Sequence, residues 1–99
     1  MEIQIQSIHF TADSKLLGFI EEKVGKLTHF YDGIISSEIF LRIDKSDNST
    51  NKIAEIKLNV PGNDLYVKRQ CKTFEEAIDT GILAISKQVK KYKEKVKGL

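Results

Sequence analysis

The spacing of apolar residues divides this chain into two kinds of segment, and their order restricts the fold more than any other feature. Four segments alternate apolar and polar residues, as strands with one buried face do; they span residues 3–8, 37–44, 54–60 and 65–71. Two segments repeat apolar residues every three or four positions, as helices with one buried side do; they span residues 12–31 and 74–96. The predicted order is β-α-β-β-β-α.

Capping signals mark where both helices begin. Thr11 is the predicted N-cap of the first helix, with Asp13 in its first turn, where a negative charge is favoured. Thr73 and Glu76 have the spacing of a capping box, in which each side chain accepts a hydrogen bond from the other's backbone N–H. The second helix is therefore expected to begin directly after Thr73.

The turns connect the three later strands into an antiparallel meander. Residues 45–51 are wholly polar and are expected to form a loop, and Pro61-Gly62 suits a type II turn. Each strand has one polar face, so one face of the sheet is covered and both helices can pack on it. We expect a right-handed first crossover, which makes the first two strands parallel if they are neighbours. We predict an α+β fold, a four-stranded mixed sheet with two helices packed on one face.

Length and composition restrict the remaining possibilities. Ninety-nine residues suffice for one domain, and we expect a single domain over 1–99. No apolar run approaches the roughly 18–20 residues of a membrane span, and the amino terminus does not resemble a signal peptide. One cysteine, Cys71, permits neither an internal disulfide nor a cysteine-cluster metal site. We therefore expect a cytoplasmic protein that is a monomer when free and has no membrane partner.

No set of residues suggests catalysis. His9 and His29 are isolated, and no glycine-rich phosphate loop is present. The adjacent carboxylates Glu21-Glu22 and Glu75-Glu76 point about 100° apart on a helix, so neither forms a convergent acid–base pair. We expect a protein that is not an enzyme, with no cofactor, no metal and no small-molecule substrate.

Lysines are concentrated at the carboxyl end. Residues 87–99 contain six of the sixteen basic residues and one of the fourteen acidic residues, a net charge of +5, whereas the rest of the chain has a net charge of −3. This asymmetry is typical of a segment that meets a polyanion. It is equally typical of a solvated helix end, where cations interact favourably with the helix dipole.

The positions of these lysines on the helix favour a binding surface. Lys87, Lys91 and Lys95 form a row with steps of about 6 Å, comparable with phosphate spacing along a nucleic-acid strand. On the first helix Lys23 and Lys26 share a stripe with two aromatic residues, Phe19 and Phe30. Side-by-side helices would combine both sets into one basic surface. The two phenylalanines either pack against the second helix or stack on bases.

The exposed sheet face is a weaker candidate. Phe40, Arg42, Tyr66 and Lys68 combine aromatic and cationic side chains there, as in proteins that stack RNA bases on a sheet. The aromatic-rich strand signature of such proteins is missing, so we favour the helix surface.

The chain resembles the ribosome hibernation-promoting factor family, also called ribosome-associated translation inhibitors, in its short form. Six segments, in order and covering nearly the whole chain, carry the resemblance: Ile3-x-Ile5, Thr11 with Leu16 or Leu17, Lys26-Leu27-x-x-Phe30-Tyr31-Asp32, Ala54-Glu55-Ile56-x-Leu58-x-Val60-Pro61-Gly62, Glu76-Ala77-Ile78-Asp79 and Lys87-Gln88-Val89-x-Lys91-x-Lys93-x-Lys95. Thr73-Phe74-Glu75 departs from the family's frequent Asp-Met-Tyr. Because the sequence ends at Leu99, we expect neither the extra domain of long members nor the acidic tail of some short ones.

The resemblance implies the β-α-β-β-β-α fold and a function. Family members bind the small ribosomal subunit between head and body, where messenger and transfer RNAs would sit, and so silence and preserve idle ribosomes. The implied partners are the small subunit, its ribosomal RNA and the whole ribosome. The implied RNA-binding residues are Lys23, Lys26, Lys87, Lys90, Lys91 and Lys95.

Two other functions fit the same residues. Two helices on a small sheet also bind double-stranded RNA. The basic helix could instead bind an acidic protein, in a module that modulates a transcription factor. Competition by free duplex RNA would favour the first alternative, and binding that survives nuclease treatment would favour the second.

Overall fold

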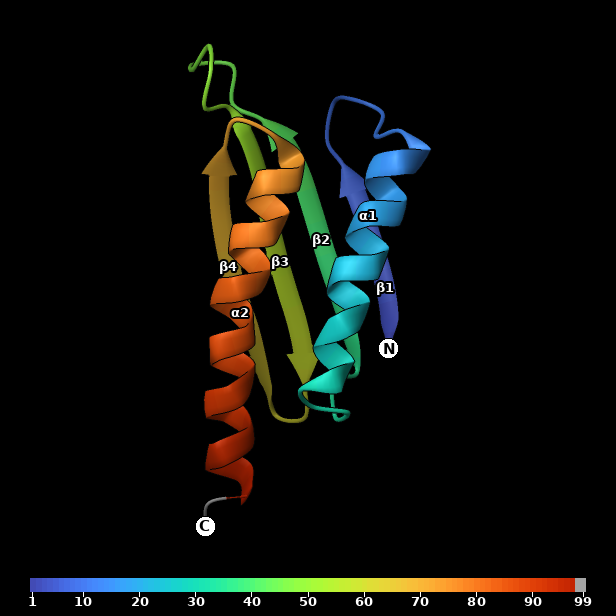
Figure 1. The fold of residues 1–99 in the computed structure, drawn as a ribbon, viewed down its shortest axis with the longest axis vertical. Helices are drawn as coiled ribbons and strands as arrows, with labels where there is room; N and C mark the ends of the chain where they lie inside the picture. Colours follow the sequence, from blue (N-terminus) through green and yellow to red (C-terminus); the bar gives the residue numbers. More distant parts are fainter. Residues whose placement is uncertain (98–99) are drawn as a thin grey trace.

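Four strands form one mixed sheet in the order β1-β2-β3-β4 in the computed structural model, which describes residues 1–97 (Figure 1). The strands are β1 (Glu2–Ser7), β2 (Ser36–Ile43), β3 (Lys52–Val60) and β4 (Asn63–Cys71). β1 pairs parallel with β2, and the β2–β3 and β3–β4 pairs are antiparallel. The predicted antiparallel meander is confirmed, and the first two strands are neighbours and parallel.

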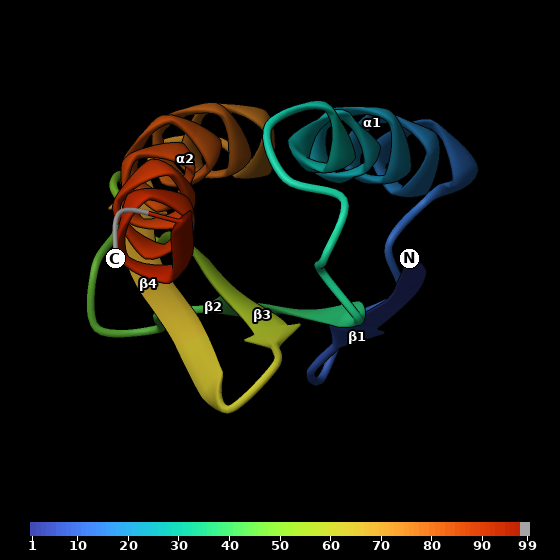
Figure 2. The same ribbon diagram turned by 90° about the horizontal axis from the view of Figure 1, so that it is seen from below.

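Both helices lie side by side on one face of this sheet, and the other face is left uncovered (Figure 2). They are α1 (Ser14–Gly25), which continues into the 3₁₀-helix η1 (Lys26–His29), and α2 (Phe74–Lys97). The layers meet in one apolar core, where fully buried side chains come from the sheet and from both helices: Ile39, Leu41, Ile56, Leu58, Ile20, Val24, Leu27, Ile78, Ile85 and Val89. The two-layer α+β class predicted from the sequence is confirmed.

Two glycines meet local geometric demands. Gly62 has φ +76°, which suits the second central position of a type II turn, and the flanking Val60 and Asn63 are paired. In α2, a Cβ atom added at Gly81 would lie 3.0 Å from Ile56 Cδ1. The missing side chain therefore lets α2 approach β3 closely.

The start and end of the first helix differ from the prediction. Asp13 is the N-cap instead of Thr11, and its Oδ1 accepts a hydrogen bond of 2.8 Å from the backbone N of Leu16. A carboxylate at this position satisfies a free N–H group and also interacts with the positive end of the helix dipole, which a threonine hydroxyl does not. The α-helix ends at Gly25, where the chain tightens into η1, instead of continuing to residue 31.

The capping box of α2 is only partly formed. Thr73 Oγ1 accepts a hydrogen bond of 3.1 Å from Glu76 N, as predicted. The Glu76 carboxylate instead accepts from the backbone N of Lys72, at 3.4 Å. The reciprocal bond has moved one residue towards β4, and it ties the helix start to the end of that strand.

The β1-α1-β2 connection is left-handed, and the prediction of a right-handed crossover is wrong. Seen from the helix side, as in Figure 1, the chain rises along β1, descends along α1 in front of the sheet and rises again along β2 on the left. One edge of β2 is occupied by β3, so β1 takes the other edge. α1 must also cover the same apolar face of the sheet as α2. With β1 parallel to β2 on its free edge and α1 on that face, the β1-α1-β2 connection has to be left-handed.

Replacing the N-cap of α1 should test the revised helix start. We expect Asp13→Ala to lower the free energy of unfolding by roughly 1 kcal/mol, since the Leu16 N–H loses its acceptor. Thr11→Ala is the matched control and should change stability by less than about 0.5 kcal/mol. Urea unfolding followed by circular dichroism measures both. A larger loss in Thr11→Ala would contradict this assignment.

One buried hydroxyl in β2 lacks a partner. Ser37 is fully buried, and its Oγ has no hydrogen-bond partner among the described residues. We expect Ser37→Ala to raise the free energy of unfolding by about 1 kcal/mol, because it removes an unpaired buried polar group. The neighbouring Ser36 accepts a hydrogen bond from Asn59 Nδ2 at 2.5 Å, so Ser36→Ala should be destabilising. Equal losses in the two variants would contradict the prediction.

Candidate nucleic-acid interface

The carboxyl-terminal half of α2 presents a group of exposed lysines. Ile85 and Val89 on its inner side are fully buried in the core. The outer residues are exposed, and they include four of the predicted site residues: Lys87, Lys90, Lys91 and Lys95. The side chain of Lys97 lies outside the part that the structure describes.

Two lysines on one flank of α2 contact Phe30, the residue that follows η1. Lys90 Nζ lies 5.7 Å from the ring centroid of Phe30. Lys93 Nζ donates a hydrogen bond of 3.2 Å to the backbone oxygen of the same residue. Phe30 follows η1 directly, so these contacts bring the aromatic residue into the lysine surface.

The other flank of α2 faces the β3–β4 turn. Lys91 and Lys95 border a shallow depression there that is also lined by Asn63 and Leu65. The row formed by Lys87, Lys91 and Lys95 therefore runs along the side of α2 away from α1. We name the surface formed by both flanks the lysine ridge, consisting of Lys87, Lys90, Lys91, Lys93 and Lys95.

Contacts with the sheet side hold the lysine ridge in place. Tyr92 donates a hydrogen bond of 2.5 Å to the backbone oxygen of Pro61, and its ring meets that of Tyr31 edge to face with centroids 5.6 Å apart. Gln88 Nε2 donates to the backbone oxygen of Tyr66 at 2.9 Å. Desolvation, followed by the neighbouring Tyr31, raises the pKa of Tyr92.

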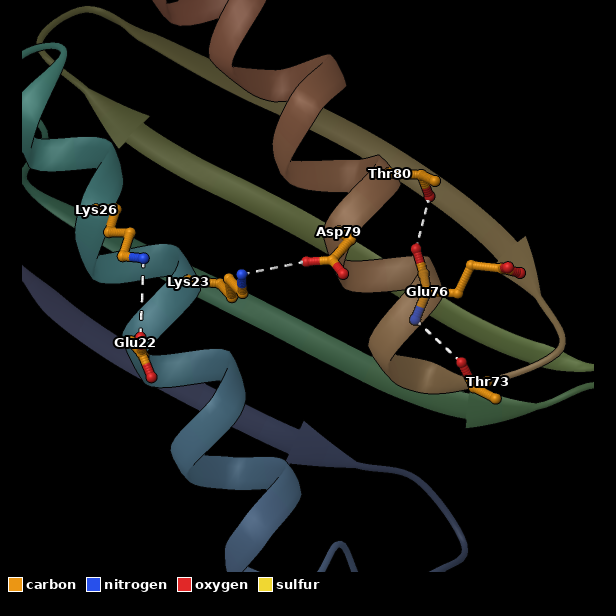
Figure 3. A network of polar contacts seen from close by, with 7 residues as sticks. All are labelled: Glu22, Lys23, Lys26, Thr73, Glu76, Asp79 and Thr80. Atoms are coloured by element: carbon orange, nitrogen blue, oxygen red, sulfur yellow. Dashed lines mark hydrogen bonds and ion pairs between the residues drawn. The ribbon is translucent and has the colours of Figure 1, made fainter.

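The two predicted site lysines of α1 and η1, Lys23 and Lys26, already have carboxylate partners (Figure 3). Lys23 Nζ lies 3.8 Å from Asp79 Oδ1 on α2, and also 5.4 Å from the ring centroid of Phe19. Lys26 Nζ lies 3.8 Å from Glu22 Oε1. Such exposed pairs contribute about 0–1 kcal/mol each, and they occupy both ammonium groups in the free protein. Among the described residues, by contrast, no ion pair involves the lysine ridge.

The uncovered face of the sheet is occupied by its own ion pairs. Arg42 pairs with Glu55, which also accepts a hydrogen bond of 2.9 Å from the Tyr66 hydroxyl. Desolvation, followed by the hydrogen bond to Glu55, raises the pKa of Tyr66. Lys57 Nζ lies 3.8 Å from Glu38 Oε2. Because Arg42 and Lys57 are paired with carboxylates, this face attracts a polyanion less strongly than the lysine ridge does.

Other kinds of site find little support in the part of the chain that the structure describes. Residues 1–97 contain no group of three or more His, Cys, Asp and Glu side chains placed to hold a metal ion. Within the same residues no helix combines the length and apolar content needed to cross a membrane. Cys71 is half-buried, with its Sγ 3.8 Å from Thr80 Oγ1.

Comparison with known proteins assigns the chain to a family. The family model described as sigma 54 modulation protein / S30EA ribosomal protein matches residues 3–97. The chain belongs to this family. The resemblance stated from the sequence is therefore confirmed.

Individual relatives agree with the family match. A ribosome hibernation promoting factor from Pseudomonas putida is 23% identical over 99 residues, covering 100% of this chain and 93% of that protein. One from Klebsiella oxytoca is 27% identical over 97 residues and covers 98% of each chain.

Solved structures share the fold. A ribosomal subunit interface protein from Coxiella burnetii aligns with a TM-score of 0.84 at 22% identity, covering 94% of this chain and 98% of that one. The N-terminal domain of Thermus thermophilus Protein Y gives a TM-score of 0.81 at 22% identity, covering 93% and 99%.

All six predicted site residues lie in the helical layer. Lys23 and Lys26 are paired with carboxylates, whereas the four on α2 have no such partner among the described residues. Sequence reasoning missed the carboxylate partners of Lys23 and Lys26. Glu22 was detectable, because it stands four residues before Lys26, the usual spacing of a helical ion pair. Asp79 was not, since its distance from Lys23 depends on which turn of α1 faces which turn of α2.

The Lys23–Asp79 pair yields a prediction about salt dependence. In Asp79→Asn, Lys23 becomes available to a phosphate, so the log–log salt slope for RNA binding should become steeper by up to about 0.9. Glu75→Gln makes the same change of charge in the first turn of α2, and it serves as the control. Filter binding at several salt concentrations measures both slopes. Equal steepening in both variants would assign the effect to net charge and contradict a specific role of the pair.

Proposed function

We propose that this protein is a ribosome hibernation factor that binds the small ribosomal subunit and blocks the sites of messenger and transfer RNA. Family membership and the names of the relatives and of one structural neighbour support a role at the ribosome. The observation that carries the proposal is the lysine ridge, whose cations have no carboxylate partners within the described residues.

Affinity comes from neutralising phosphates. The candidate contacts are Lys87, Lys90, Lys91 and Lys95, with Lys23 and Lys26 at the border. Five or six phosphate contacts give a log–log salt slope of roughly −4 to −5. Lysine is a point charge without the two-pronged geometry that reads base edges. The shape of the RNA cleft, and not its base sequence, therefore sets this part of the specificity.

Inhibition follows from occupancy, without a chemical step. Contacts from Gln88 and Tyr92 to the sheet layer hold the helix that carries the ridge before binding, so the entropy lost when RNA binds is that of the lysine side chains and not of the backbone. The sheet lies beneath α2 and α1 lies beside it, so both add to the folded body that carries the ridge (Figure 2). This body occupies the volume that messenger or transfer RNA would need.

Reversing the charge of the lysine row should abolish binding. Lys87→Glu, Lys91→Glu and Lys95→Glu in one variant remove three phosphate contacts and add three repulsive charges. We expect affinity for small subunits to fall by about 100-fold or more at moderate salt. Co-sedimentation with small subunits, large subunits and whole ribosomes measures the loss. The wild type should pellet with small subunits and whole ribosomes, less so at high salt, and bound transfer RNA should compete with it.

A matched control separates position from net charge. Lys15, Lys45 and Lys72 lie in the first turn of α1, in the β2–β3 loop and just before α2, at the end of the molecule away from the ridge (Figure 1). Their triple replacement by Glu changes the charge equally and should retain most of the binding. Equal loss in both triple variants would contradict the assigned site. Free duplex RNA competing as well as small subunits would favour the double-stranded RNA alternative.

A further inference from the structure

One large apolar side chain is exposed inside the candidate interface. Phe30 is 39% exposed, although Phe19 on the same stripe is partly buried against the core. It follows η1, and its backbone N donates to Leu27 O at 3.0 Å, so the short 3₁₀-helix fixes its position. Phe19 therefore packs against the core, whereas packing does not account for the exposed surface of Phe30.

Phe30 lines a shallow depression with polar rims. The other lining residues are Thr28, His29, Tyr31, Asp32 and Lys93. Lys93 Nζ uses one donor on Phe30 O and retains two for another acceptor. Lys90 Nζ stands 5.7 Å from the Phe30 ring centroid. The Lys90 ammonium thus lies over the exposed Phe30 ring, the Lys93 ammonium lies at the backbone oxygen of the same residue, and the Asp32 carboxylate supplies an acceptor.

This combination matches the parts of one nucleotide. An aromatic ring offers a stacking surface to any base, and nearby ammonium groups suit the phosphate. Each of the four RNA bases has an N–H group that can donate a hydrogen bond to a carboxylate such as that of Asp32. An A-form duplex keeps its bases stacked inside, so only an unpaired base can reach the ring.

We infer that Phe30, with Lys90 and Lys93, forms a subsite for one unstacked nucleobase and its phosphate. This inference rests on the proposed function and adds a feature of the RNA to it: the bound strand has an unpaired nucleotide at this flank of the lysine ridge. The subsite discriminates single-stranded or looped RNA from duplex. The lysine row on the other side of α2 supplies charge without that discrimination.

Two substitutions at one position separate stacking from structure. Phe30→Leu keeps an apolar side chain of similar size but removes the aromatic face. We expect affinity for a single-stranded oligoribonucleotide to fall by about 5- to 100-fold, with an unchanged log–log salt slope, because no phosphate contact is lost. Phe30→Trp should restore or exceed the wild-type affinity. Thermal unfolding of each variant shows whether the fold is retained.

The chain has no tryptophan, so Phe30→Trp also supplies a direct fluorescent probe. Stacking of a base on the indole should quench its fluorescence when the oligonucleotide binds. Leu83→Trp is the control, because Leu83 is 66% exposed on α2 and does not line the depression. Strong quenching in Phe30→Trp with little in Leu83→Trp would support the subsite. Equal quenching in both, or none in either despite binding, would overturn it.

The outcomes for the subsite and for the ribosome are distinguishable. If Phe30→Leu binds oligonucleotides and small subunits like the wild type, while the triple lysine variant does not, the subsite is wrong and the proposed function stands. If Phe30→Leu weakens oligonucleotide binding but the wild type does not pellet with ribosomes, the subsite stands and the ribosomal role fails. Quenching by duplex RNA equal to that by single strands would also overturn the subsite.

Discussion

The sheet has a single apolar face, and both helices depend on it. Ile39 and Leu41 of β2 and Ile56 and Leu58 of β3 point to this face, so neither α1 nor α2 can be placed on the other. Two helices that share one face must lie side by side (Figure 2). Their contact brings the end of η1 against the lysines of α2, and so the candidate interface is a consequence of how the core is buried.

The charged side chains of α2 change from acidic at its start to basic at its end, and the helix dipole explains only part of this change. Glu75 and Glu76 stand in the first turn, where the dipole favours anions. The dipole effect decays within one turn of a helix end. In a helix ending at Lys97 it reaches Lys95 but not Lys87 or Lys90. The solvated-end interpretation therefore does not account for most of the lysine ridge, and this favours the proposed polyanionic partner.

The sequence was sufficient for features that depend on local pattern. Alternation and helical spacing identified the strands, the two helices and the shared face, and Thr73 marked the start of α2. Features that depend on competition between neighbours were missed: Asp13 caps α1 in preference to Thr11, and Glu76 binds Lys72 N. The left-handed crossover was missed because the prediction relied on the general preference for right-handed β-α-β connections. In this chain, burying both helices on one face of the sheet requires the opposite hand. The exposure of Phe30 depends on where η1 ends, which periodicity does not specify.

In the proposed complex, phosphate contacts of the lysine ridge and base stacking on Phe30 differ in their dependence on salt, and this difference determines what each would contribute. A slope of −4 to −5 implies that electrostatic affinity falls roughly 250- to 1,000-fold between 50 and 200 mM salt. Stacking on an aromatic ring releases few counterions and keeps its strength over that range. Low salt therefore favours any accessible RNA, whereas higher salt favours RNA that combines phosphates along α2 with an unpaired base beside η1. Selectivity for a folded RNA cleft then increases as overall affinity falls, an outcome that lysines alone cannot produce.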